Sequence, residues 1–114
     1  GPEISIFLDS RNFVSGDKVG YNSTLMADFA DPDGINHIGL GLGKEILAVI
    51  DEDWTSSVVL NSYYTPELND FTRGSVLYSM TDLAIGRHTL MIRAWDMFDN
   101  SSEETIVFYV FEDP

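Results

Sequence analysis

The chain of 114 residues has the length of one domain, and with 44% hydrophobic and 12% aromatic residues it can bury a core. Nineteen acidic residues against six basic ones give a net charge of −13, which repels phosphate backbones and anionic membranes and argues against nucleic acid as a partner. Cysteine is absent, which excludes disulfides, thiolate nucleophiles and zinc–thiolate sites within these 114 residues.

The start of the chain, GPEISIFLDS, lacks the basic segment of a signal peptide. No later run approaches the roughly 20 apolar residues that span a bilayer, so we expect no membrane insertion by this domain. Gly1-Pro2 is interpreted as the remnant of a cleaved expression tag. Residues 3–114 are then expected to form a single domain, a piece of a longer protein.

Alternation of apolar and polar residues with a period of two predicts strands along most of the chain, and no segment keeps a helical period over three turns. KEILAVID (44–51) is apolar on both faces, which is typical of a strand covered on both sides or at an interface. In chain order, the expected strands lie in residues 3–9, 23–31, 44–51, 56–64, 74–80, 88–96 and 104–111.

Turn signals separate these segments. Asp31-Pro32-Asp33-Gly34 has the residue order of a type I turn, the glycines at 39, 41 and 43 indicate an irregular or bulged stretch, and residues 83–86 fit the corner before the penultimate strand of an immunoglobulin-like (Ig-like) sandwich. Short strands at this spacing predict an all-β fold, an Ig-like or fibronectin III-like antiparallel β-sandwich of seven or eight strands.

Two acidic loops are expected to meet at one end of the sandwich, because the second-to-third and sixth-to-seventh strand loops of an Ig-like fold emerge together. Hard oxygen ligands from two loops suit Ca²⁺, although the spacing is not that of an EF-hand. The alternative is that these side chains cap turn amides, in which case the domain needs no cofactor. The candidate ligands are Asp31, Asp33, Asn36, Asp96, Asp99 and Asn100.

Histidine offers little for catalysis. His88 shares parity with Leu90 and Ile92, so its ring is expected to pack against the preceding corner and bond to backbone, while His37 is expected at the surface. Two distant histidines without cysteine, and no nucleophile elbow, favour a domain that is not an enzyme.

The aromatic residues have two interpretations. Exposed rings form sugar-stacking platforms or docking patches, whereas rings beneath a long loop at residues 63–74 would cap the edges of the core. Trp95 points away from Leu90 and Ile92 and is expected on the outer face of its sheet. The candidate interaction residues are Trp54, Tyr63, Tyr64, Phe71 and Trp95.

Several short motifs, in this order and spacing, carry a resemblance that runs from about Glu3 to Val110. They are Asp33-Gly34-Ile35-Asn36, Gly41-Leu42-Gly43, Leu60-Asn61-Ser62-Tyr63-Tyr64, Gly86-Arg87-His88-Thr89-Leu90, Ala94-Trp95-Asp96 and Asn100-Ser101-Ser102. The chain resembles the β-domain that follows the catalytic domain in PorU-type sortases of the type IX secretion system, which are gingipain-related cysteine peptidases of Bacteroidota. One departure is Lys44-Glu45, which stands where that family has Gly-His.

The resemblance implies a parent at the cell surface that removes C-terminal secretion signals from cargo proteins and attaches them to lipopolysaccharide of the outer membrane. It implies two kinds of partner, namely the neighbouring domains of the parent chain and an outer-membrane barrel component of the same system. None of the family's catalytic residues maps onto this chain, so the domain is expected to be a non-catalytic spacer and interaction module. The alternative function is a free-standing surface adhesin or carbohydrate-binding module.

Overall fold

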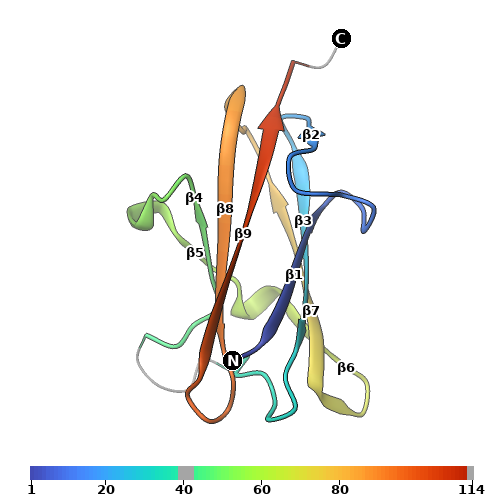
Figure 1. The fold of residues 1–114 in the computed structure, drawn as a ribbon, viewed down its shortest axis with the longest axis vertical. Helices are drawn as coiled ribbons and strands as arrows, with labels where there is room; N and C mark the ends of the chain where they lie inside the picture. The colour runs from blue at the N-terminus through green and yellow to red at the C-terminus, as the bar shows by residue number, and fades with distance from the viewer. Residues whose placement is uncertain (39–42, 113–114) are drawn as a thin grey trace.

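The computed structural model describes residues 1–38 and 43–112, and within them the chain forms a sandwich of two sheets (Figure 1). The four-stranded sheet, here sheet A, has the order β1-β3-β7-β6, with β1 Glu3–Leu8, β3 Ser23–Ala30, β7 Asp70–Met80 and β6 Tyr64–Glu67. The five-stranded sheet, sheet B, has the order β2-β9-β8-β4-β5, with β2 Lys18–Val19, β9 Ser101–Val110, β8 Gly86–Trp95, β4 Leu47–Ile50 and β5 Val58–Val59. Two short 3₁₀ helices, η1 (Trp54–Ser56) and η2 (Asn61–Tyr63), flank β5.

The expected all-β sandwich is confirmed. Within the described residues it has seven strands of four or more residues. Two further strands of two residues each, β2 and β5, form the edges of sheet B. The chain passes from sheet A to sheet B between β1 and β2, where β2 pairs with β9 in parallel and the other strand pairs are antiparallel.

The core lies between the sheets and follows the predicted alternation. Leu25 and Ala27 of β3 are fully buried, as are Leu90 and Ile92 of β8, and Phe108 of β9 packs with them. Burial of such side chains contributes about 1.5–3 kcal/mol each, which is why the period of two sets the register of every long strand.

The expectation of a long loop at residues 63–74 is wrong. These residues form the hairpin of β6 and β7, whose turn includes Asn69 with φ 59°. Pro66 is accommodated because β6 is an edge strand of sheet A. The strand expected at 56–64 is likewise interrupted, since η2 separates β5 from β6.

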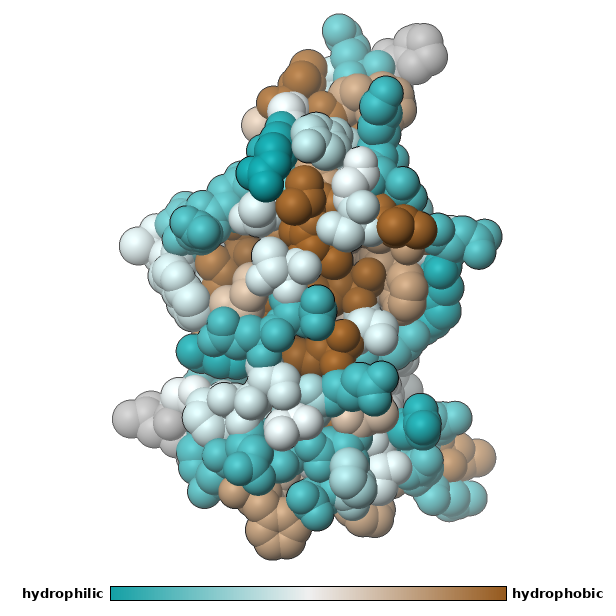
Figure 2. Space-filling view, in the orientation of Figure 1, coloured by the Kyte–Doolittle hydropathy of each residue, from teal (hydrophilic) through white to brown (hydrophobic). Residues whose placement is uncertain are grey.

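The molecule is elongated, with extents of 45 × 29 × 20 Å. Figure 1 shows the N-terminus near the foot of β9, whereas β9 ends toward the opposite end of the long axis. Figure 2 shows apolar residues running down the middle of the same face, between polar margins. Gly39 and Gly41 of the predicted bulge lie outside the described residues. No helix of the part described is long and apolar enough to cross a membrane.

Candidate functional site

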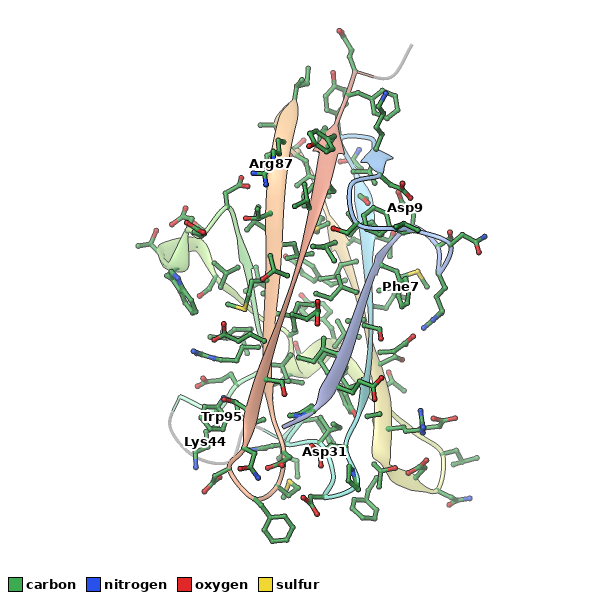
Figure 3. All side chains as sticks on the ribbon, viewed as in Figure 1. Phe7, Asp9, Asp31, Lys44, Arg87 and Trp95 are labelled. Carbon is green, nitrogen blue, oxygen red and sulfur yellow. The ribbon has the colours of Figure 1, made fainter. Side chains whose placement is uncertain are left out.

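The two acidic loops meet at one end of the sandwich, as expected from the sequence. Ile35 forms an isolated β-bridge with Asp96, the Asn36 amide donates to the Trp95 carbonyl at 2.9 Å, and the Met97 amide donates to the Gly34 carbonyl at 3.2 Å. We call residues 31–37 and 96–100 the loop end. Figure 3 shows Asp31 there, at the lower end of the molecule.

Three of the six candidate metal ligands come together. One carboxylate oxygen each from Asp31, Asp33 and Asp96 lies within 4.8 Å of the others. Asp31 and Asp96 are buried, with 4% and 2% of their surface exposed, whereas Asp33 is exposed. Buried carboxylates need hydrogen bonds or cations to offset their desolvation, and the structure shows which bonds they make.

Asp96 closes the β8–β9 turn. Its Oδ1 accepts the amides of Phe98 and Asn100, both at 2.9 Å, and its Oδ2 accepts Nδ2 of Asn100 at 3.0 Å. Burial acts to raise the pKa of Asp96, but the hydrogen bonds from Asn100 and Phe98 outweigh burial and hold that pKa below its ordinary value. Asp96 therefore works as an ionised cap.

Asp31 caps the other loop. Its Oδ1 accepts the Asp33 amide at 2.8 Å, and its carbonyl accepts the Gly34 amide at 2.9 Å, which confirms the predicted turn. Of the remaining candidates, Asn36 is buried, Asn100 bonds to Asp96, and Asp99 forms an ion pair of 2.6 Å with Lys44. Turn capping thus accounts for Asp31 and Asp96, and an ion pair accounts for Asp99.

The loop end also displays apolar side chains. Gly34 has φ 90°, and a Cβ added there would lie 2.7 Å from Cδ2 of Phe71 and 3.3 Å from Cγ of Met97, so both side chains pack over this glycine. Phe71 and Phe98 are each 70% exposed. In Figure 2 apolar residues protrude at this lower end of the molecule.

The five candidate interaction aromatics do not form one patch. Tyr64 is buried in the core, and Tyr63 packs edge-on against Tyr78. Trp95 is half-buried on the outer face of sheet B, with Nζ of Lys44 5.8 Å from its ring, as the labelled pair in Figure 3 shows. Phe71 lies on β7 and packs over Gly34 of the loop end, and Trp54 lies on the sheet B side, beside Arg93 of β8.

His88 lies at the opposite end of β8 and bonds as predicted to the preceding corner. Its Nε2 is 2.6 Å from the Ala84 carbonyl and its Nδ1 is 2.7 Å from the Asp51 carboxylate. Burial acts to lower the pKa of His88, but the bonds to Ala84 and Asp51 raise it above its ordinary value. His37 is half-buried and stacks on Tyr64, with 4.8 Å between ring centroids.

The sequence reasoning missed a groove on the outer face of sheet B. It has a volume of about 440 Å³ and is lined by Thr89 and Met91 of β8, Glu103 and Thr105 of β9, and Glu52 and Trp54 beyond β4. The outward parity of HTLMIRAWD predicts which side chains of β8 face this way, but the Glu52–Trp54 wall depends on how the chain turns after β4.

Comparison with solved structures shows that the chain is similar to a segment of a much longer protein. A segment of the dimeric latent PorU from Porphyromonas gingivalis matches 99% of this chain with a TM-score of 0.91 and 36% sequence identity. This chain spans 10% of the length of that protein. No family model and no curated protein sequence matches the chain.

More distant structures share the fold alone. The endo-β-1,4-mannanase from Thermotoga petrophila matches 96% of this chain, which spans 20% of the enzyme, with a TM-score of 0.58 and 8% identity. The BIgI domain of the beta protein from S. agalactiae, solved bound to CEACAM1, matches over 98% of this chain and 100% of its own length, with a TM-score of 0.51 and 10% identity. This likeness supports the Ig-like sandwich.

Proposed function

Because this chain is a PorU-type β-sandwich domain, we propose that it is the non-catalytic spacer and interaction domain of a larger type IX secretion sortase. Such a parent removes C-terminal secretion signals from cargo and attaches cargo to lipopolysaccharide at the cell surface. Its partners would be the neighbouring domains of the parent chain and an outer-membrane barrel component of the same system.

The observation that carries the spacer role is the position of the termini. They lie at opposite ends of a sandwich 45 Å long (Figure 1), so whatever precedes and follows the domain in the parent is held apart by its length. A sandwich with one continuous core bends little, in contrast to a flexible linker of the same length.

The loop end supports a contact with the domain before this one. The first strand begins at Glu3, whose register partner Ala30 on β3 directly precedes the loop end, and Phe98 lies in the other turn of the same end. The entering chain and the exposed Phe71 and Phe98 therefore share one end of the molecule, where a preceding domain would cover these rings.

Domain replacement in the parent protein tests this function. We expect a flexible Gly/Ser linker in place of residues 3–112 to impair removal of the cargo's C-terminal signal, measured by the mass of secreted cargo. An unrelated rigid Ig-like domain should restore processing if spacing alone is needed, and should fail if the surface is also needed. Full processing with the flexible linker would contradict the proposal.

The alternative of a carbohydrate-binding module rests on one observation, the half-exposed Trp54 beside the groove on sheet B. An aromatic ring at the rim of a groove is the usual platform for sugar stacking. Glycan-array binding that disappears in Trp54→Ala would favour that alternative, and its absence favours the spacer.

A further inference from the structure

The groove on the outer face of sheet B has one apolar and hydroxyl-bearing floor and two acidic sides. Met91 of β8 pairs with Thr105 of β9, and with Thr89 they line the floor. Glu103, the register partner of Arg93, stands on the β9 side. Glu52 and Trp54 stand on the other side, beyond the end of β4.

The wall of this groove is built from a strained turn. Asp51 and Glu52 are consecutive non-glycine residues in the left-handed region, with φ of 55° and 62°, a conformation that costs free energy in residues with a Cβ. Hydrogen bonds from both the backbone and the side chain of Asp51 hold the turn in this conformation. The Asp51 amide donates to the Thr89 carbonyl, and its carboxylate accepts the Thr89 amide at 3.0 Å and faces His88 at 2.7 Å.

The result of this anchoring is a fixed position for Glu52 and Trp54. After the turn, Asp53 caps η1 by accepting the Thr55 amide, and η1 carries Trp54 over the sheet. Trp54 is 50% exposed, while Val49 beneath this wall is 2% exposed. The anchored turn thus places an acid and an indole at the rim of the groove.

The charges indicate which ligand fits. Among the described residues, no basic side chain forms an ion pair with Glu52 or Glu103, whereas Asp28 and Asp99 each have one. Two basic residues lie near the groove: Arg87 shares a neighbouring hollow with Glu52, and Arg93 is the register partner of Glu103. The Arg93 guanidinium lies 5.3 Å from the Trp54 ring centroid, so one face of Trp54 already stacks a cation. Within the described residues neither arginine forms an ion pair with Glu52 or Glu103.

We propose that this groove binds a lysine- or arginine-bearing segment of a partner protein. The aliphatic stem would lie on Met91 and the threonine methyl groups, and the cation would reach Glu52 and Glu103. The net charge of −13 would steer a basic segment toward the domain. This inference rests on the interaction half of the proposed function and names the chemistry of the partner.

A second groove, on sheet A, lacks these features. It is lined by Arg11, Asp28 and Arg73, among others. There Arg11 donates to Asp28 through Nε at 2.9 Å and Nη2 at 2.7 Å, so the opposite charges neutralise one another. Glu67 also lines that groove without an ion pair among the described residues, but no tryptophan stands beside it.

Amide NMR titration tests the proposal directly. The probe is the end-blocked peptide Gly-Lys-Gly-Lys-Gly, and the same peptide with both lysines acetylated is its neutral control. We expect the largest chemical-shift changes at Thr89, Met91 and Thr105. Glu52→Gln combined with Glu103→Gln should weaken binding about fivefold or more, because two exposed ion pairs are lost.

The matched control is Glu3→Gln combined with Glu67→Gln, which removes two exposed charges from sheet A and should weaken binding less than about twofold. Thermal unfolding checks that both double variants fold. Equal weakening by the two pairs, equal binding of the acetylated peptide, or no binding of the lysine peptide would overturn the proposal. Shifts at the same amides with mannohexaose but not with the lysine peptide would assign the groove to carbohydrate instead. None of these outcomes bears on the spacer role, which the linker replacement tests.

Discussion

The phenol of Tyr64 occupies the space where a side chain at Gly74 would begin. Tyr64 lies on β6 and Gly74 on the adjacent β7, and a Cβ built on Gly74 would fall inside the phenol. The same ring stacks on His37 and lies 5.8 Å from Phe29, the register partner of Gly74 on β3. An aromatic ring laid over a cross-strand glycine is a known way to fill such a gap in a sheet.

Gly74→Ala is therefore expected to destabilise the domain by about 1–3 kcal/mol, since the added methyl group must displace the Tyr64 ring from a filled core. Urea unfolding measures the change. Ser75→Ala, at the neighbouring position, should cost less than about 0.5 kcal/mol. In a Tyr64→Leu background the cost of Gly74→Ala should fall, and an unchanged cost there would refute the steric explanation.

Tyr64 also makes stability depend on alkaline pH. Burial, together with the negative charge of Asp70, raises the pKa of Tyr64 to about 12, above the ordinary value of 10. The neutral phenol is thus favoured by folding, and its contribution is complete below pH 10 and is lost as the pH rises through 12.

Tyr64→Phe should abolish this component of the alkaline decline, which unfolding between pH 9 and 12 would reveal. Near pH 7 the same substitution should change the unfolding free energy by less than about 1 kcal/mol, because among the described residues the hydroxyl has no hydrogen-bond partner. A loss well above that at pH 7 would show that the hydroxyl is bonded.

His88 should give a second pH dependence, nearer neutrality. Both ring nitrogens face acceptors, Ala84 and Asp51, so both bonds are made only by the protonated imidazolium. Its pKa is raised in the folded state, so its stabilising contribution is present below the unfolded value of about 6.5 and is lost as the pH rises through the folded value. His88→Gln should flatten this decline in urea unfolding between pH 5.5 and 9, and an unaltered slope would count against the charged form.

Asp96→Ala should be among the most costly substitutions at the loop end. It removes the acceptor of the Phe98 and Asn100 amides in a part-buried turn, which costs about 1–3 kcal/mol. Asp33→Ala, at an exposed carboxylate, should cost less than about 1 kcal/mol. Circular dichroism during thermal unfolding would compare them, and equal losses would contradict the cap.

Calcium binding can be tested at the three clustered carboxylates, Asp31, Asp33 and Asp96. Because Asp31 and Asp96 already accept turn amides, we expect millimolar CaCl₂ to leave the melting temperature within about 1 °C of a control at matched ionic strength. A larger rise that disappears in Asp33→Asn would instead assign the loop end to a Ca²⁺ site.

The alternation of apolar residues was sufficient to predict both faces of the long strands. Leu25, Ile92 and Phe108 are buried because a strand offers only two faces, and only one of them meets the other sheet. The hairpin of β6 and β7 escaped prediction, because an edge strand tolerates Pro66 and keeps polar residues.

The candidate site likewise has one feature that the sequence predicted and one that it did not. The meeting of the two acidic loops follows from topology and was predicted, whereas the anchoring of Asp51 to His88, 37 residues apart, depends on the register of β4 against β8. Nothing in the sequence near Glu52 indicates that this turn leans over sheet B, because the cause lies in contacts made by the strand beneath.

The parallel pairing of β2 with β9 has a mechanical consequence. The chain enters at one end of the molecule and leaves toward the other. The two residues before β2 extend its contact with β9, since the Gly16 amide donates to the Val107 carbonyl at 2.7 Å and the Tyr109 amide donates to the Asp17 carbonyl at 3.1 Å. When the ends are pulled apart, these bonds are sheared together along the strands rather than opened one after another. Tension along the parent chain would therefore load this short pairing in shear, in addition to the β1–β3 pairing through which the chain enters.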